Sequence, residues 1–520
     1  MFTPRPVVWS CDAPLPEAEL AGYAWDGADL VIGTGGAQAA GRLPPLGADG
    51  CHLTCRKTAT GHLIAADSRG QARLFLYADR GRWAVANGFA PLVRAVAARG
   101  WRLRVRPWAL AAWSAPQTAF DQLPWTATAA AEIRLVPAWA GVAVTAGRAQ
   151  VVTLPRPAPA TLDEALRPWL SRLVTLLCRP GLRPAMDLTG GLDSRCILAM
   201  ALYLRESGQL SDLDALRFVS ARHQAGDLAV AGDLAARYGL RLNVGQEGTL
   251  RPRSLSERFA LWQDVSLGSF AGPYLPLAQE EAGLVTVGGQ GGEYLRSLDW
   301  VSELAPLQAE APRGFLARRA FRAELARAWD MAQGALLPGA PQATQYRWAF
   351  RLRALAGHHC QMGLRLTPLA GAGFAGWAAT RPPAALQGGR LPFEILHRLA
   401  PELVGMPFLD PTRCAPADLA ANAANPQPPL IAAPGQVWAE APTTAPPPEA
   451  ADPTPPATAF AHALDAAEAA GAARLIGPAP LKAAGAALAA APAAGLPDRL
   501  AFRPVHLGLL AGLLAGAAQS

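Results

Sequence analysis

The sequence has very little lysine: Lys57 and Lys482 are the only two among its 47 basic residues, and the others are arginine. No basic run stands out, so the net charge of +7 gives little support to nucleic-acid binding. The chain does not start with a charged segment followed by an apolar stretch, and its longest late apolar run, 507–518, is too short to cross a bilayer. These absences predict a protein that is neither secreted nor membrane-bound and has no nucleic-acid partner.

Cysteine is also scarce, with seven scattered residues of which only Cys51 and Cys55 are close in sequence. An odd number without paired spacing predicts free thiols in a reduced, cytoplasmic protein. The length of 520 residues allows two to four domains. A composition of 51% hydrophobic and 17% charged residues excludes a wholly disordered or fibrous chain.

Residues 1–155 predict a mostly antiparallel β domain, because short β-prone segments alternate with Gly, Asp and Ser. The expected strands are 29–33, 61–66, 72–77, 82–86, 141–145 and 150–153. A helix is expected at 91–98, and the proline-rich segment 155–160 predicts a stiff linker.

From residue 161 the pattern changes to alternating helices and strands, after a capping box at Thr161 and Glu164 that predicts a helix over 162–178. The expected strands are 184–188, 216–220 and 285–287, with helices at 193–205 and 227–238. This order predicts an α/β fold with a parallel sheet, in which ligands bind at the carboxyl ends of the strands. Residues 315–405 and 457–520 are expected to be helical, and the proline-rich segment 414–456 is expected to be a flexible loop.

The stretch 186–195, Met-Asp-Leu-Thr-Gly-Gly-Leu-Asp-Ser-Arg, carries the strongest chemical signal. Gly190 and Gly191 have no Cβ, so backbone N–H groups can approach an anion, and the helix that follows adds the positive end of its dipole. Thr189 and Ser194 add hydroxyl groups, and Asp193 is placed to hold a divalent cation against phosphate oxygens. A glycine pair alone is more often a structural turn.

The order of residues in 189–194 resembles the pyrophosphatase loop of ATP-dependent ligases that release AMP and pyrophosphate. About a hundred residues later, 284–294 resembles the second motif of asparagine synthetase-like enzymes, and 273–280 is similar to a helix of that family. The segments 65–77, 83–86 and 133–137 look like the β-sandwich glutaminase domain that precedes the synthetase domain in this family.

The resemblance implies the domain organisation and the ligands. Residues 1–155 would form a degenerate glutaminase-like β-sandwich, 161–413 an ATP-pyrophosphatase domain, and 457–520 its C-terminal helices. ATP and Mg²⁺ are the implied cofactors. The implied nucleotide-binding residues are Leu188, Thr189, Gly190, Gly191, Asp193, Ser194, Val219, Gly288 and Gly289, and the implied metal ligands are Asp193 and Glu293.

Three positions depart from the family pattern. Glutaminase activity needs a cysteine directly after the initiator methionine, and here that residue is Phe2, so the attacking amine should come from the substrate or from free ammonia. Glu293 stands where the family usually has aspartate. The family's late lysine has no clear counterpart: Lys482 has unmatched surroundings, and Arg365 is the alternative catalytic cation.

Family members without that cysteine include β-lactam and carbapenam synthetases and the macrolactam synthetases of lasso peptides. The chain length, the segment 401–408 and the expected loop at 414–456 favour a macrolactam synthetase. Its partners would then be a precursor or core peptide, a leader peptidase and a leader-recognition protein. The alternatives are a small-molecule β-lactam-type synthetase, an ammonia-dependent amidotransferase, and a non-catalytic scaffold that binds nucleotide or peptide.

Overall fold

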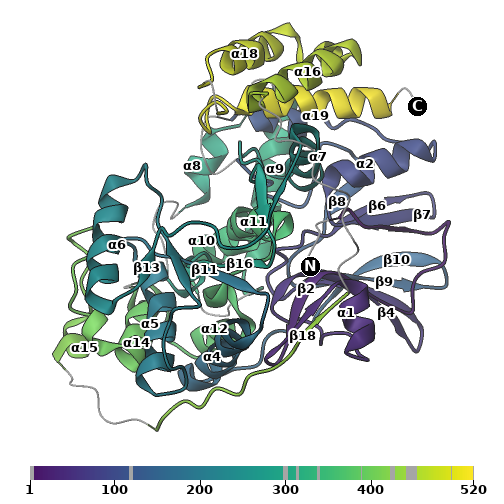
Figure 1. Ribbon diagram of the computed structural model, residues 1–520. Helices are drawn as coiled ribbons and strands as arrows, with labels where there is room; N and C mark the ends of the chain where they lie inside the picture. Colours follow the sequence, from purple (N-terminus) through teal and green to yellow (C-terminus); the bar gives the residue numbers. More distant parts are fainter. Residues whose placement is uncertain are drawn as a thin grey trace.

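The computed structural model describes residues 5–115, 121–296, 303–311, 315–335, 340–387, 389–421, 428–440, 454–492 and 495–518. Figure 1 shows an antiparallel β part on the right, a parallel sheet flanked by helices at the lower left, and the C-terminal helices across the top. The Phe2 position, on which the prediction of a lost glutaminase activity rests, lies outside the described residues.

The N-terminal part contains two sheets. The smaller sheet has the strand order β1-β7-β6-β8 and is antiparallel throughout. The larger has the order β10-β9-β5-β4-β2-β3-β18, in which only β18 is parallel to its neighbour. Their strands are β1 (Val8–Ser10), β2 (Ala18–Asp26), β3 (Asp29–Ile32), β4 (Gly50–Thr58), β5 (Gly61–Ala66), β6 (Phe75–Asp79), β7 (Arg82–Ala86), β8 (Ile133–Leu135), β9 (Ala140–Thr145), β10 (Arg148–Thr153) and β18 (Val437–Ala439).

The alternation of side chains along β6 builds two layers. Leu76 packs in one core with Leu53 and Ile64 of the larger sheet. Its neighbours Phe75 and Tyr77 point to the opposite face, where α2 (Phe89–Ala98) covers them. The prediction of a mostly antiparallel β region is confirmed. Cys51 and Cys55 are buried free thiols, and burial raises the pKa of Cys55 to about 12.

The prediction that residues 414–456 lack regular structure is wrong for their described part, which contains α15 (Ala417–Ala421) and β18. Prolines exclude a helix interior but not an extended chain, which here pairs with the edge strand β3. The Leu30 N–H donates to the Gln436 carbonyl at 2.8 Å. A Cβ on Gly36 would lie 2.4 Å from the Trp438 carbonyl oxygen, so the glycine allows this strand to dock.

The second part is built on a fully parallel sheet of order β13-β12-β11-β16-β17, as the alternation of strands and helices predicts. Its strands are β11 (Arg183–Asp187), β12 (Arg217–Val219), β13 (Arg241–Leu242), β16 (Leu284–Val287) and β17 (Arg365–Leu366). The helices around it include α4 (Leu162–Cys178), α5 (Leu192–Glu206), α6 (Ala225–Tyr238), α12 (Ala372–Ala379) and α14 (Arg390–Leu399). The predicted capping box of α4, between Thr161 and Glu164, is present.

A mainly helical segment joins this sheet to the rest. Its elements are β14 (Leu250–Pro252), α7 (Leu255–Ser266), β15 (Gln279–Glu281), the 3₁₀ turn η3 (Gly292–Leu295), α8 (Leu304–Ala309), α9 (Phe315–Ala332), α10 (Gln342–Tyr346), the π-helical turn η4 (Arg347–Leu352), α11 (Arg353–Met362), η5 (Pro368–Ala370), α13 (Pro383–Gln387) and η6 (Pro401–Leu403).

The C-terminal helices are α16 (Pro456–Ala469), α17 (Ala472–Ile476), α18 (Pro478–Ala489) and α19 (Arg503–Ala517). They share a core with α2 and α7, so they cover the outer face of the smaller sheet (Figure 1). Phe460 and Phe502 pack edge-on against Trp262 of α7. Within the described ranges, no helix combines the length and the apolar content that crossing a membrane requires.

The loop after β5 connects the antiparallel part to the parallel sheet. Arg69 donates from Nε to the Ala370 carbonyl at 2.8 Å, and Gln71 donates to the Thr367 hydroxyl at 2.9 Å. Both acceptors follow β17 closely. The N-terminal part therefore supports the strand that carries Arg365.

Candidate functional site

The turn between β11 and α5 lies at the carboxyl end of the central strand. The Ser194 hydroxyl folds back to accept the Thr189 N–H at 3.2 Å, and the Thr189 hydroxyl accepts the Gly191 N–H at 3.1 Å. Asp227, on α6, accepts the Gly190 N–H at 2.8 Å. The turn thus already holds an anionic oxygen on a backbone N–H, next to the start of a helix.

A second glycine loop, after β16, packs directly on the start of α5. A Cβ on Gly289 would lie 2.7 Å from the Ser194 nitrogen, and one on Gly292 would lie 2.3 Å from the Asp193 Cγ. Gly291 has a φ of +96°, which favours glycine. Any larger residue at these positions would push the two loops apart, so the sequence motifs at 189–194 and 284–294 meet in space.

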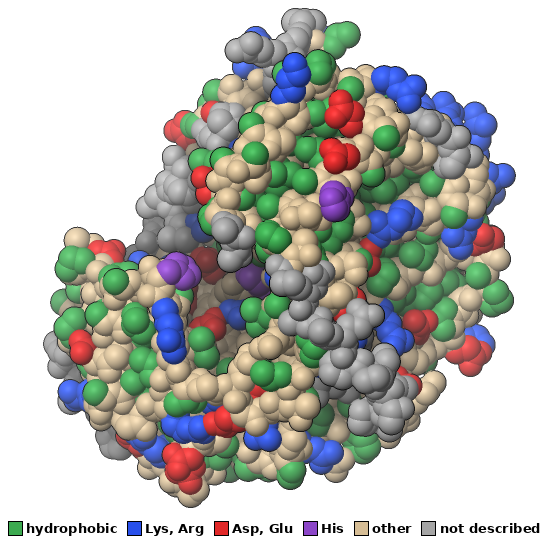
Figure 2. All heavy atoms as spheres, turned by 45° about the horizontal axis from the view of Figure 1, so that its top comes forward, with side chains coloured by type: hydrophobic (Ala, Val, Ile, Leu, Met, Phe, Trp, Pro, Cys, Tyr) green, Lys and Arg blue, Asp and Glu red, His purple; other side chains and the backbone are tan. Residues whose placement is uncertain are grey.

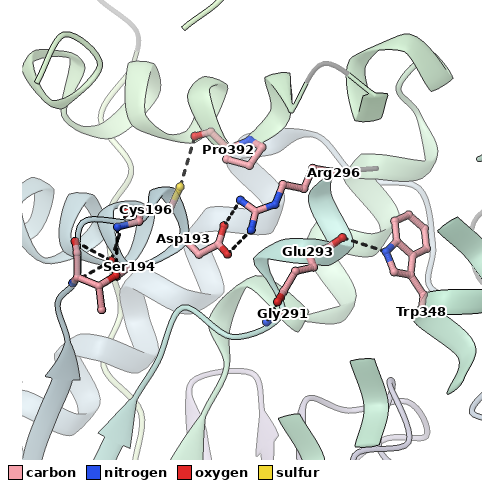
Figure 3. Close-up of polar contacts among 10 residues, drawn as sticks. Asp193, Ser194, Cys196, Gly291, Glu293, Arg296, Trp348 and Pro392 are labelled. Atoms are coloured by element: carbon pink, nitrogen blue, oxygen red, sulfur yellow. Dashed lines mark hydrogen bonds and ion pairs between the residues drawn. The ribbon is translucent and has the colours of Figure 1, made fainter. Parts of the chain in front are cut away.

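Asp193 forms a bidentate ion pair with Arg296, with distances of 2.8 and 2.7 Å between guanidinium nitrogens and carboxylate oxygens (Figure 3). The two side chains retain 20% and 14% of their accessible surface. Burial raises the pKa of Asp193 to about 6, Arg296 opposes this rise, and the nearby Glu293 adds to it. The carboxylate is therefore held by an arginine that the sequence motifs do not contain.

Glu293 is fixed by its own loop. Its carboxylate accepts the Gly291 N–H at 3.1 Å, and its carbonyl accepts the indole N–H of Trp348 at 2.9 Å (Figure 3). The arrangement places Glu293 and Asp193 close enough for their charges to interact.

The described residues contain no group of three or more His, Cys, Asp or Glu side chains that could hold a metal ion alone. Mg²⁺ is commonly held by one or two carboxylates together with substrate phosphates and water. Asp193 and Glu293 fit that smaller donor set once Arg296 has moved off Asp193. The Gly190 N–H, which already binds a carboxylate oxygen, fits a phosphate oxygen.

Arg365 lies at the same edge of the sheet. Its guanidinium pairs with Asp187 at the end of β11 and donates from Nε to the Gln290 amide oxygen at 3.1 Å. A Cβ on Gly288 would collide with both members of that pair. The structure thus brings Arg365 and Gly288 together with the glycine loops.

The other predicted residues are placed less uniformly. Leu188 is fully buried, and its N–H donates to the carbonyl of Val219, whose side chain is exposed at the end of β12. Lys482 is exposed on α18, which packs against α16, α17 and α19, and the structure does not bring it to the glycine loops. Figure 1 shows α18 at the top of the molecule, away from β11.

Several residues that sequence reasoning missed complete the site. Arg195 is fully buried and donates to the carbonyls of Met406 at 2.8 Å and Pro407 at 2.6 Å, with its guanidinium 3.7 Å from the centre of the Phe408 ring. This clamp brings Leu409 onto Gly190, whose carbonyl accepts the Leu409 N–H at 3.0 Å. Residues 406–409 are therefore packed against the turn between β11 and α5.

The missed contacts have weak sequence signals. Arg195 directly follows the first motif, and Arg296 is the first residue after η3. An arginine at either position does not by itself indicate a binding site. Asp227 and Leu409 are brought in by separate elements far apart in the chain. Comparison of the chain with known protein families and with curated proteins found no match.

Proposed function

We propose that this protein is an ATP-dependent ligase that adenylates a substrate carboxylate, releases pyrophosphate, and then joins the acyl group to an amine with release of AMP. The observation that carries the proposal is the meeting of two glycine loops at the carboxyl edge of a parallel sheet. One loop presents the Gly190 N–H at the start of α5, and the other packs on Asp193. That edge is the usual ligand position in such sheets.

The protein's part in this reaction is electrostatic. The Gly190 N–H and the start of α5 would bind phosphate oxygens, while Asp193 and Glu293 would hold Mg²⁺. Bound Mg²⁺ supplies positive charge that neutralises the phosphates as the carboxylate attacks. Arg365 lies beside these groups and is the better of the two candidate catalytic cations. Leu409, which packs on Gly190, would limit access of water to the acyl-adenylate.

The favoured substrate is a peptide, with macrolactam formation between its amine and an Asp or Glu side chain. This choice rests on the family resemblance and on Phe2 in place of the nucleophilic cysteine. A precursor or core peptide, a leader peptidase and a leader-recognition protein are the proposed partners. A β-lactam-type or ammonia-dependent ligase would use the same adenylation site on a different substrate.

A non-catalytic scaffold is the second candidate. It is favoured by the Asp193–Arg296 pair, which occupies the proposed metal ligand, and by the absence of Lys482 from the site. A scaffold would bind nucleotide or peptide without turnover.

Pyrophosphate release from ATP and Mg²⁺ tests the proposal, with glutamine, ammonium, and core peptides added separately, with and without the leader peptidase. Peptide-dependent release with a product lighter by one water supports the macrolactam synthetase. Asp193→Asn should lower release at least about 100-fold, Arg365→Ala should also lower it, and Lys482→Ala should not. ATP binding without release from any substrate would refute the ligase in favour of the scaffold.

A further inference from the structure

A pocket of about 530 Å³ lies beside the proposed adenylation site, and of its lining residues only Arg365 has a part in the chemistry described above. Its walls come from α7 and Arg253 before it, the segment 273–277, the strands β15, β16 and β17, and the end of α11, with Pro456, Gly495 and Leu496 from the C-terminal part. Figure 2 shows this face of the molecule hollowed near its centre, between a lobe on the left and the larger mass above and to the right, with acidic, basic and histidine side chains in the hollow. The volume is in the range of pockets that enclose small ligands.

Most of the pocket wall is apolar or aromatic. Leu277, which is 64% exposed, and Met362 and Leu496 contribute aliphatic surface. Tyr274 and His359 contribute rings whose centres are 5.7 Å apart. Burial lowers the pKa of His359 to about 4, so this ring is uncharged at neutral pH. The wall therefore suits an apolar or aromatic side chain.

The charges in the pocket are paired with one exception. Arg253 pairs with Glu280 at 2.8 Å, Glu281 with Arg217 at 2.9 Å, and Arg365 with Asp187. Arg258 donates from Nε to the Pro276 carbonyl at 2.8 Å, and in the part of the chain that the structure describes it has no carboxylate within ion-pair distance. A guanidinium in this position can take a carboxylate in two hydrogen bonds.

Arg365 is common to the pocket and the proposed adenylation site, since it lines the pocket while its guanidinium contacts Asp187 and Gln290. Only the side chain of Arg365 therefore separates a molecule in the pocket from the carboxyl edge of the sheet. Neither glycine loop lines the pocket, so it can be filled while phosphates occupy the loops.

We propose that this pocket binds a segment of the amine-bearing substrate that carries an apolar or aromatic side chain beside a carboxylate, with the carboxylate on Arg258. The identification of the ligand as a substrate rests on the proposed function. The pocket's preference for a carboxylate with an apolar or aromatic side chain is independent of that function, because it follows from the apolar wall and from Arg258 alone.

Methyl NMR of protein labelled with ¹³C-methyl methionine tests the preference on the full chain. Met362 lines the pocket, and its signal is assigned with Met362→Leu. N-acetylphenylalanine should shift the Met362 signal on titration, and N-acetylphenylalanine amide should bind at least about tenfold more weakly because it cannot pair with Arg258. Arg258→Gln should abolish the difference between the two compounds.

Gly363 offers a variant that fills the pocket without backbone strain. Its φ of −170° is open to any residue, and a Cβ there meets no atom within 4 Å. Gly363→Leu should remove the Met362 response, whereas the matched control Gly363→Ala should retain it.

An unmoved Met362 signal with the acid, equal affinities for acid and amide, or an unchanged response in Gly363→Leu would each overturn the proposal. If Met362 responds as expected but no substrate supports pyrophosphate release, the pocket's preference stands and the ligase function falls. If release is peptide-dependent, Arg258→Gln should raise the KM for peptide at least about tenfold and change kcat little.

Discussion

Replacing Arg296 with methionine would remove both hydrogen bonds to Asp193 and leave its carboxylate without a hydrogen-bonded cation, although the charge of Arg413 still acts on it. Breaking a fully buried ion pair from one side costs about 3–5 kcal/mol. Since these side chains retain 14% and 20% of their surface, water compensates in part, and we expect a loss of roughly 2–3 kcal/mol of stability at pH 7.5.

The pH dependence follows from the pKa of Asp193. Its folded value of about 6 lies above the ordinary 3.8, so the folded state holds the proton more tightly. The contribution of Asp193 to the free energy of unfolding is fully present below pH 3.8 and is lost as the pH rises through 6. The loss is roughly 3 kcal/mol, because the pKa differs by about two units between the folded and unfolded states. Without Arg296 the pKa rises further, so the variant at pH 5 carries a neutral carboxyl and should lose less than about half as much stability as at pH 7.5.

Urea unfolding followed by tryptophan fluorescence, at pH 5 and pH 7.5, provides the measurement. A chain of this size can unfold in more than one step, so the comparison uses the transition that Asp193→Asn shifts. The double variant Asp193→Asn, Arg296→Met should recover most of the loss, because no charge is left unpaired. Arg251→Met, which breaks an exposed pair with Glu257, is the matched control and should cost under about 1 kcal/mol. Equal losses at both pH values, or no recovery in the double variant, would refute the reasoning.

Two further predictions concern the packing around the site. Gly292→Ala should destabilise the protein by about 1–3 kcal/mol in the same urea assay, because its Cβ would meet Asp193. The control Gly485→Ala, whose Cβ would lie in open space on α18, should stabilise the protein by up to about 1 kcal/mol. Arg195→Lys cannot reproduce the two hydrogen bonds to the carbonyls of Met406 and Pro407. Amide hydrogen exchange of residues 403–410 should therefore quicken at least about tenfold, while that of β11 stays unchanged. Equal exchange rates in the variant and the parent protein would contradict the role of Arg195.

Much of the fold could be predicted from local patterns. The strand Arg82–Ala86 and the helix Leu162–Cys178 have the predicted bounds, because alternation and capping are written in adjacent residues. Strands β2 and β4 were missed because their small and polar residues show no clear alternation. β18 could not be predicted, since proline-rich sequence becomes a strand only where an edge such as β3 receives it.

For the candidate site, as for the fold, the local motifs could be predicted and the contacts between separate elements could not. Glycines at 190, 191, 288 and 289 were found because each loop is a local motif, and the topology of the sheet then brought the loops together. Arg296 on Asp193 and Asp227 on Gly190 depend on pairing between separate elements, which no local pattern contains. Lys482 was a candidate because the family uses a late lysine and this is the only late lysine in the sequence, but its surroundings carry no motif that would place it at the site.

These two unpredicted partners bear on how a nucleotide would enter the site. Asp227 gives the Gly190 N–H an anionic partner, and Arg296 gives Asp193 a cationic one. Under the proposed function, a phosphate would replace Asp227 at the Gly190 N–H, and a divalent cation would replace Arg296 at Asp193. Each replacement carries charge of the same sign as the side chain that it displaces. A metal ion alone would displace Arg296 and gain the carboxylates of Asp193 and Glu293, but Asp227 would still hold the Gly190 N–H and no phosphate would complete the metal's ligands. A nucleotide alone would face Asp227 and find Asp193 still neutralised by Arg296. Because an unpaired charge in a partly buried site is costly, the favourable exchange replaces both partners together. Under the proposed function, the resting pairs would therefore favour entry of the nucleotide and the metal as one complex.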